Sequence, residues 1–222
     1  DSNAGVATNT AVNSAAGIGF GWLRLVTEFE SETSFDQKIM FKRIRNALSV
    51  HIDPMSQEPD GSDMKYAFVD SLEQRSEFKR QYPKANANST NLIGQEPYKG
   101  WFTADTVLVC EYYRIKFTEE TLCMYVDGST GWKSDKATLA VALYPDGKPK
   151  ERKSARRVVE WFKITGSDVL ERTVIKCKWI PVFPVYGDEI DIEGKVIRSG
   201  IIRNAKGPAQ SYNVMMTAAT EE

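Results

Sequence analysis

The segment TVLVCEYYRIKF, residues 106–117, alternates with a period of two, which is typical of a β-strand with one buried face. One side of this alternation collects five apolar residues: Val107, Val109, Tyr113, Ile115 and Phe117. Residues 121–126 predict a second strand, joined to the first by Thr118-Glu119-Glu120. Two such runs with so short a connection predict an antiparallel hairpin.

Further alternating segments predict strands on both sides of this hairpin. Residues 20–30 and 37–44 flank a polar turn, and residues 156–165 and 169–180 flank Gly166-Ser167-Asp168, so each pair predicts another hairpin. Short strands are predicted at residues 50–52, at residues 66–69 and on either side of Gly194. Pro181 and Pro184 cannot donate to a sheet, so their strand is predicted at an edge or at a sheet boundary.

Four segments predict helices: residues 5–16 ended by Gly17 and Gly19, residues 71–82, residues 135–144 after Ser134, and residues 210–222. Ser71 and Gln74 have the spacing of a capping box, and Pro83 ends that helix. Pro208 is predicted in the first turn of the last helix, and residues 84–99 form the longest predicted loop. Because strands outnumber helices and pair locally, the predicted class is α+β, mostly antiparallel sheet built from hairpins with a few short flanking helices.

Composition excludes several classes of function. The 222 residues include 29 basic and 30 acidic ones, so the net charge of -1 gives no overall attraction for nucleic acid or anionic lipid. No apolar run approaches the ~20 residues of a membrane span, and the polar start lacks the layout of a signal peptide, so no membrane partner is predicted. Cys110, Cys123 and Cys177 are odd in number and lie in apolar segments, which predicts buried, reduced thiols.

The catalytic signals are weak. His51 is the only histidine, and nothing in the sequence connects it with a nucleophile, so a structural histidine is favoured. The glycines of residues 17–21 precede a strand and not a helix, which argues against a phosphate-binding loop. The sequence therefore predicts no enzyme and no cofactor.

Two clusters of acidic residues are candidates for metal binding or acid-base chemistry. Asp53, Glu58, Asp60 and Asp63 lie around Gly61, but they lack the ligand order of a calcium loop and predict a solvated turn. Asp188, Glu189, Asp191 and Glu193 alternate along a predicted strand edge and predict a solvated face. No metal site is predicted.

One basic run stands out against the balanced charge. Its six cations are Lys148, Lys150, Arg152, Lys153, Arg156 and Arg157, interrupted by the single acid Glu151. Such a run can hold phosphates by charge alone, with salt-sensitive and sequence-blind affinity. A flexible surface loop entering a strand is the favoured interpretation, and a nucleic-acid-binding module acting through residues 148–157 is the alternative function.

Five segments occur in the same order as in the portal proteins of short-tailed phages. They are residues 19–28; Asp53-Pro54 with Ser62-Asp63 and the helix closing on Tyr82-Pro83; residues 107–113; residues 180–187; and residues 200–203 with Lys206, Gln210 and Asn213. On these segments the chain resembles the podovirus-type portal family over nearly all of residues 5–222. The fifth segment departs from the family pattern, because Gly207 stands where Asp is usual and Ala209-Gln210 replaces a usual Gln-Arg pair. No side-chain role is therefore carried over there.

The resemblance implies a non-catalytic subunit of a dodecameric ring at one capsid vertex. In that family the ring offers a docking platform to the packaging motor (the terminase) and a central channel to double-stranded DNA during packaging and ejection. It also implies a virion location after assembly in the host cytoplasm, with other copies of the subunit, the capsid and the motor as partners.

Because family members continue into stem helices, the resemblance implies a division of this chain. Residues 5–206 are expected to form a wing-like α+β domain, and residues 207–222 the start of a truncated stem-type helix. Residues 1–4 have the composition of an expression remnant and are left out of the fold prediction.

Overall fold

The computed structural model describes residues 3–85, 105–124, 128–135, 150–175 and 177–221. Within these residues every strand pairing is antiparallel. The helices of this part are α1 (Ala4–Ile18), α2 (Arg75–Gln81), α3 (Ile201–Glu221) and the short 3-10 helix η1 (Ala47–Ser49). The predicted α+β class with mostly antiparallel sheet is confirmed.

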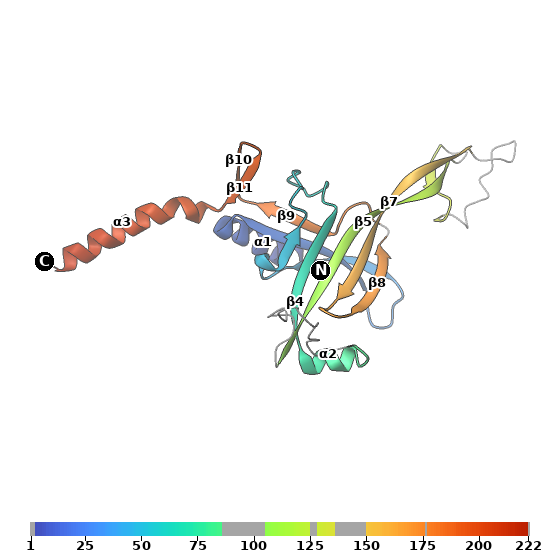
Figure 1. Ribbon diagram of the computed structural model, residues 1–222, viewed down its shortest axis with the longest axis horizontal. Coiled ribbons are helices and arrows are strands. Elements are labelled where there is room, and N and C mark those ends of the chain that lie inside the picture. Colours follow the sequence, from blue (N-terminus) through green and yellow to red (C-terminus); the bar gives the residue numbers. More distant parts are fainter. Residues whose placement is uncertain (1–2, 86–104, 125–127, 136–149, 176, 222) are drawn as a thin grey trace, which may run out of the picture.

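The strands form a large sheet, a small sheet and a separate hairpin (Figure 1). The large sheet has the order β3 (Val50–Ile52), β4 (Tyr66–Gln74), β5 (Thr106–Met124), β7 (Lys150–Ile164) and β8 (Val169–Ile175), with β6 (Thr130–Trp132) paired to one end of β5. The small sheet has the order β2 (Gln37–Arg43), β1 (Phe20–Phe29) and β9 (Val182–Tyr186). The hairpin of β10 (Asp188–Ile192) and β11 (Lys195–Ser199) leads into α3.

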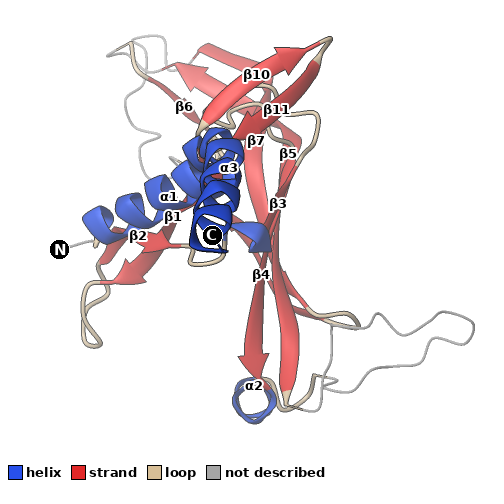
Figure 2. Cartoon of the chain, turned by 90° about the vertical axis from the view of Figure 1, so that its left-hand side faces the viewer, coloured by secondary structure: helices blue, strands red, loops and turns tan. Residues whose placement is uncertain are grey.

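The main core lies between the two sheets. Figure 2 shows α1, β1 and β2 together on one side of the long strands. Trp22 and Val182 of the small sheet are buried in one cluster with Tyr113 and Val159 of the large sheet. The indole of Trp22 also donates to the carbonyl oxygen of Ala47 at 2.9 Å, which satisfies its buried N–H.

Helix α1 covers the other face of the small sheet with alanines. Ala7, Ala11 and Ala15 are each at most 4% exposed, and their spacing of four residues places them on one side of the helix. Small side chains let the helix backbone approach β1 and β2 closely. Residues 5–16 were predicted as a helix, and Gly19 closes it with φ +99° and an N–H that donates to the Ala15 carbonyl oxygen.

Several other predictions are also confirmed. β1 and β2 form the predicted hairpin, β7 and β8 form the hairpin around residues 166–168, and β10 and β11 flank Gly194. β9, which contains Pro184, lies at the edge of its sheet.

The prediction of a hairpin at residues 118–120 was wrong. β5 continues without a turn through Thr118, Glu119 and Glu120, and residues 110–124 pair with residues 150–164 of β7. Pairing with β7 extends the ladder through this segment, and the connection contains no Gly, Pro, Asn or Asp to favour a turn. Phe117 is 65% exposed as a result, because β5 and β7 run past the core as a two-stranded ribbon.

The predicted capping box at Ser71 and Gln74 was also wrong. β4 runs to Gln74 because residues 66–74 pair with residues 106–114 of β5, and the Ser71 hydroxyl donates to the Val109 carbonyl oxygen. The helix is therefore only α2, whose Phe78 is fully buried against Val107 and Val109. Tertiary pairing has overridden a local helix signal.

The last helix begins earlier than predicted. α3 starts at Ile201, so Pro208 lies inside it and not in its first turn. α3 contacts α1, and Gly200, directly before α3, lies against the backbone of Ala16 and Gly17. The predicted helix at residues 135–144 and most of the predicted loop at residues 84–99 lie outside the described residues.

Candidate functional site

Four glycines lie where the backbone segments around the start of α3 approach one another closely. We call Gly19, Gly21, Gly187 and Gly200 the glycine joint. A Cβ added at Gly21 would lie 2.0 Å from the carbonyl oxygen of Ala11, and one at Gly200 would lie 2.2 Å from that of Ala16. Separations this short are impossible for a side chain, so the backbones of β1 and α3 must both contact α1 directly.

The other two glycines lie between elements: Gly19 directly follows α1, and Gly187 separates β9 from β10. A Cβ at Gly187 would lie 2.7 Å from the Ser199 carbonyl oxygen, and one at Gly19 would lie 2.9 Å from the Ser199 Cα. The Gly187 N–H donates to the Gly19 carbonyl oxygen at 2.9 Å. Close backbone contacts therefore hold Gly200 against α1, and Ser199 against Gly19 and Gly187, directly before α3 begins.

Beyond this joint α3 projects from the body of the chain (Figure 1). Every described side chain from Ile201 to Thr220 is exposed. Along one side runs what we call the α3 seam: Ile201, Ala205, Pro208, Tyr212, Met215 and Ala219. Their alternating spacing of four and three residues is the heptad period of helices that pack on other helices. Tyr212 is 62% and Met215 70% exposed, which is an apolar face without a partner within the described part of the chain.

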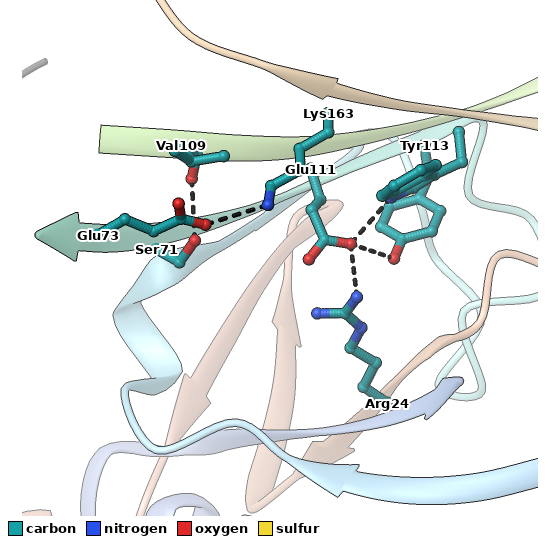
Figure 3. A network of polar contacts seen from close by, with 8 residues as sticks. Arg24, Ser71, Glu73, Val109, Glu111, Tyr113 and Lys163 are labelled. Atoms are coloured by element: carbon teal, nitrogen blue, oxygen red, sulfur yellow. Dashed lines mark hydrogen bonds and ion pairs between the residues drawn. The ribbon is translucent and has the colours of Figure 1, made fainter. Parts of the chain in front are cut away.

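Glu111 on β5 joins the two sheets. One of its oxygens, Oε2, accepts from Arg24 of β1 at 2.5 Å and from the Tyr113 hydroxyl and the Trp161 indole at 2.9 Å each (Figure 3). Three donors on one oxygen compensate for its partial burial. Burial and the neighbouring carboxylate raise the pKa of Tyr113, so its hydroxyl stays protonated and continues to donate.

The basic run lies in β7 and not in a loop from Lys150 onward. The favoured loop interpretation was therefore wrong for residues 150–155, because their pairing with β5 makes them strand, as was predicted only from residue 156. Alternation puts Lys150, Arg152 and Arg156 on one face and Lys153 and Arg157 on the other. Lys148 lies outside the described residues.

Two of the five described cations of this run make contacts within the chain. Arg156 donates to Glu120 at 3.0 Å and to Asp135 at 2.5 Å. Arg157 lies over the Trp179 ring at 4.7 Å and donates to the Ser62 carbonyl oxygen at 3.1 Å. Arg156 therefore connects β7 with the segments around Glu120 and Asp135, and Arg157 connects it with those around Ser62 and Trp179.

The carboxylates near Gly61 stabilise turns. Asp63 accepts from the Ser56 hydroxyl and the Gln57 N–H at 2.6 Å each, and Asp53 accepts from the Met55 N–H at 3.0 Å. Burial opposes ionisation of Asp63, but these hydrogen bonds outweigh it and hold its pKa below the ordinary range. In the described part of the chain no group of three or more His, Cys, Asp or Glu side chains could hold a metal ion.

The remaining candidates are surface features. His51 is 62% exposed on β3, with its Nε2 3.3 Å from an oxygen of Asp70. Asp188, Glu189 and Asp191 are exposed on β10, and Glu193 is exposed in the turn after it. These carboxylates therefore face solvent, as predicted. Cys110, Cys123 and Cys177 are free thiols; Cys110 and Cys123 are buried as predicted, whereas Cys177 is only partly buried, and burial raises the pKa of each.

The described part of the chain is thus a body of two packed sheets from which one helix projects. Comparison with known families identifies the family to which such a chain belongs. The model of the Phage P22-like portal protein family matches residues 1–222. The chain belongs to this family. The resemblance inferred from the five segments is confirmed. Portal proteins are a structural, non-catalytic family, so this portal chain has a structural role as a component of the phage particle.

Sequence reasoning missed the features that organise this portal chain. The glycines of the joint stand in segments that resembled the family, but their packing on one another gives no local signal. Glu111 was read only as part of a strand motif, and nothing in its neighbourhood predicts Arg24 as its partner. The portal chain has no described helix that meets the length and hydropathy needed to cross a bilayer.

Proposed function

We propose that this chain is the wing region of a portal subunit, and that twelve subunits form a ring at one capsid vertex. The ring conducts double-stranded DNA during packaging and ejection and docks the terminase on one side and the capsid around its rim. It acts without catalysis and is assembled in the host cytoplasm. The division into a wing-like body and a stem-type helix is part of this proposal, with the helix beginning at Ile201 and not at residue 207.

The α3 seam is the observation that supports this proposal. A ring requires two different, complementary faces on each subunit. An exposed helix of 21 residues with apolar side chains at heptad spacing suits packing against the helix of a neighbouring copy. The glycine joint would give α3 a fixed direction, which a closed ring needs in order to repeat one angle twelve times.

The test is electron microscopy of the complete portal subunit that contains these residues. We expect rings with a central channel. Tyr212→Glu with Met215→Glu places two charges in the α3 seam and should prevent closure. Asn213→Glu with Thr217→Glu, on another side of the same helix, is the matched control and should leave rings intact. Monomers from the unaltered subunit, or rings from the seam variant, would contradict the proposal.

A further inference from the structure

The register of β5, β7 and β8 separates charge between the two faces of the large sheet. Arg114 and Phe162 lie on one face of the large sheet, which we call the outer face. Tyr113 and Trp161 lie on the opposite, inner face, where they donate to the same Glu111 oxygen as Arg24 of the small sheet. The charged side chains of the outer face on these strands are Arg114, Lys116, Lys150, Arg152, Arg156 and Arg172, against Glu120 and Glu160. Those of the inner face are Lys153, Arg157 and Lys163, against Glu111, Glu119, Glu151 and Glu171. On these three strands the outer face is therefore strongly cationic and the inner face is not, while β4 adds one carboxylate, Asp70, to the outer face.

A buried carboxylate organises the centre of the outer face. The Glu160 side chain is 3% exposed and lies 2.6 Å from Arg114, 2.9 Å from Arg172 and 3.7 Å from Lys116. Burial alone would raise the pKa of Glu160, but hydrogen bonds from Arg172 and Arg114 outweigh it and keep its pKa below the ordinary value. One negative charge thus anchors three cations and leaves a local excess of positive charge. The three cations are 43%, 58% and 49% exposed, respectively, so much of each remains open to a partner.

Aromatic rings fix the orientation of these cations. Phe68 stacks on Tyr112 with centroids 4.6 Å apart, and Tyr112 stacks on Phe162 at 5.8 Å. The guanidinium carbons of Arg114 and Arg172 lie 5.1 and 5.4 Å from the Phe162 centroid. Two arginines held over one ring lose little conformational freedom when they bind a carboxylate.

This composition favours a protein partner over a nucleic acid. Aromatic residues and arginine are enriched at the energetic centres of protein interfaces. The ring faces of Phe68, Tyr112 and Phe162 are turned toward one another or toward guanidinium groups, which leaves little surface for stacking of bases. Val174, 50% exposed beside them on the outer face, adds apolar area that a phosphate backbone cannot use.

We infer that the outer face around Arg114, Phe162 and Arg172 is a docking surface for a protein segment that presents Asp or Glu side chains beside an apolar residue. Carboxylates of the partner meet the exposed parts of the two guanidinium groups, and its apolar side chain covers Val174 and the edge of Phe162. The surface lies on the sheet and not on α3, so the inference stands whether or not the chain forms rings.

The experiment is fluorescence anisotropy with the purified 222-residue chain. The probes are a labelled peptide of alternating Glu and Phe, an all-Glu peptide of equal charge, and a short DNA duplex. We expect the Glu-Phe peptide to bind more tightly than both others at physiological salt. No binding of this peptide at millimolar concentration would overturn the inference. So would equal or tighter binding of the duplex, which would assign the surface to nucleic acid, or of the all-Glu peptide, which would leave charge as the only source of affinity.

Matched variants locate the surface. Val174→Glu should weaken binding of the Glu-Phe peptide about 10-fold, because it repels carboxylates at the centre of an interface. Val169→Glu makes the same change at the other end of β8, at a residue 64% exposed, and should leave affinity unchanged. If thermal melts show that Val174→Glu is unfolded, Arg172→Gln serves instead, because an amide can still donate to Glu160. Unchanged affinity in the folded variant, or equal losses at both ends of β8, would contradict the inference.

Discussion

Arg24 on β1 donates to Glu111 on β5 across the junction of the two sheets, with 2.5 Å between the guanidinium nitrogen and the carboxylate oxygen. The two residues are 87 positions apart in the chain. Their side chains are 21% and 14% exposed, so the pair is only partly open to solvent. A short, partly buried, charged hydrogen bond in this position fixes how the small sheet sits on the large one.

Removal of Arg24 or Glu111 should lower the free energy of unfolding, and the effects of the two changes should not be additive. Arg24→Ala should lower the free energy of unfolding by about 1–3 kcal/mol, because Glu111 then loses its cation. A double-mutant cycle with Glu111→Gln, measured by urea unfolding, should give a coupling of about 0.5–3 kcal/mol. Lys42→Ala is the control, since its pair with Glu28 is 49% and 44% exposed and should contribute little. A coupling of zero would show that apolar packing alone joins the sheets.

The glycine joint predicts opposite outcomes for two neighbouring glycines. Gly200→Ala would place a Cβ 2.2 Å from the Ala16 carbonyl oxygen, so α3 must move away from α1 and the melting temperature should fall by several degrees. Gly17→Ala, in α1, meets nothing within 4 Å and should leave the melting temperature unchanged or raise it. Differential scanning calorimetry of both variants gives the two melting temperatures. Equal melting temperatures would mean that the joint does not hold α3.

Glu160 should make the free energy of unfolding decrease as pH falls. Its pKa is lower in the folded chain than in the unfolded chain, so its contribution is complete at neutral pH and is lost as pH falls through its folded-state pKa. Glu160→Gln should therefore cost about 1–3 kcal/mol at neutral pH, with a difference that shrinks in strong acid. Urea melts at a series of pH values measure this. A difference that grew as pH fell would reverse the assigned direction.

The isolated chain should be a monomer or weak dimer with a frayed α3. All described side chains of this helix are exposed, and Pro208 removes an internal hydrogen bond, so the helix lacks packing that would stabilise it alone. We expect amides of residues 210–220 to exchange with solvent far faster than those of β5. Light scattering gives the mass. A closed ring at micromolar concentration, or a protected α3, would show that the contacts of this chain are sufficient for assembly.

Any binding of DNA through the basic run should be weak and steeply salt-dependent. Lys150, Arg152 and Lys153 are exposed, so reversing their charges should abolish it while the fold is kept. Reversal at Arg156 and Arg157 should instead unfold the ribbon, because these residues pair with Glu120 and contact Trp179. Duplex binding at low salt and circular dichroism separate the two effects. Affinity that survives reversal of the exposed cations would place DNA contact elsewhere.

The sequence by itself determined the local elements and the family. Alternation predicted β1, β2 and the β7–β8 hairpin, and glycines at residues 17–19 predicted the end of α1, because these features depend on neighbours within a few positions. Five ordered segments were enough to predict the portal family.

Tertiary structure alone decided the long ladder of β5, the end of β4 and the contacts that fix α3. In each case the deciding partner lies far away in sequence: β7 for Thr118 to Glu120, β5 for Ser71, and α1 for Gly200. Arg24 and Glu111, like Arg114 and Glu160, meet only after the strand register is set. Backbone groups accept whichever partner the whole fold brings to them, and no local pattern encodes that choice.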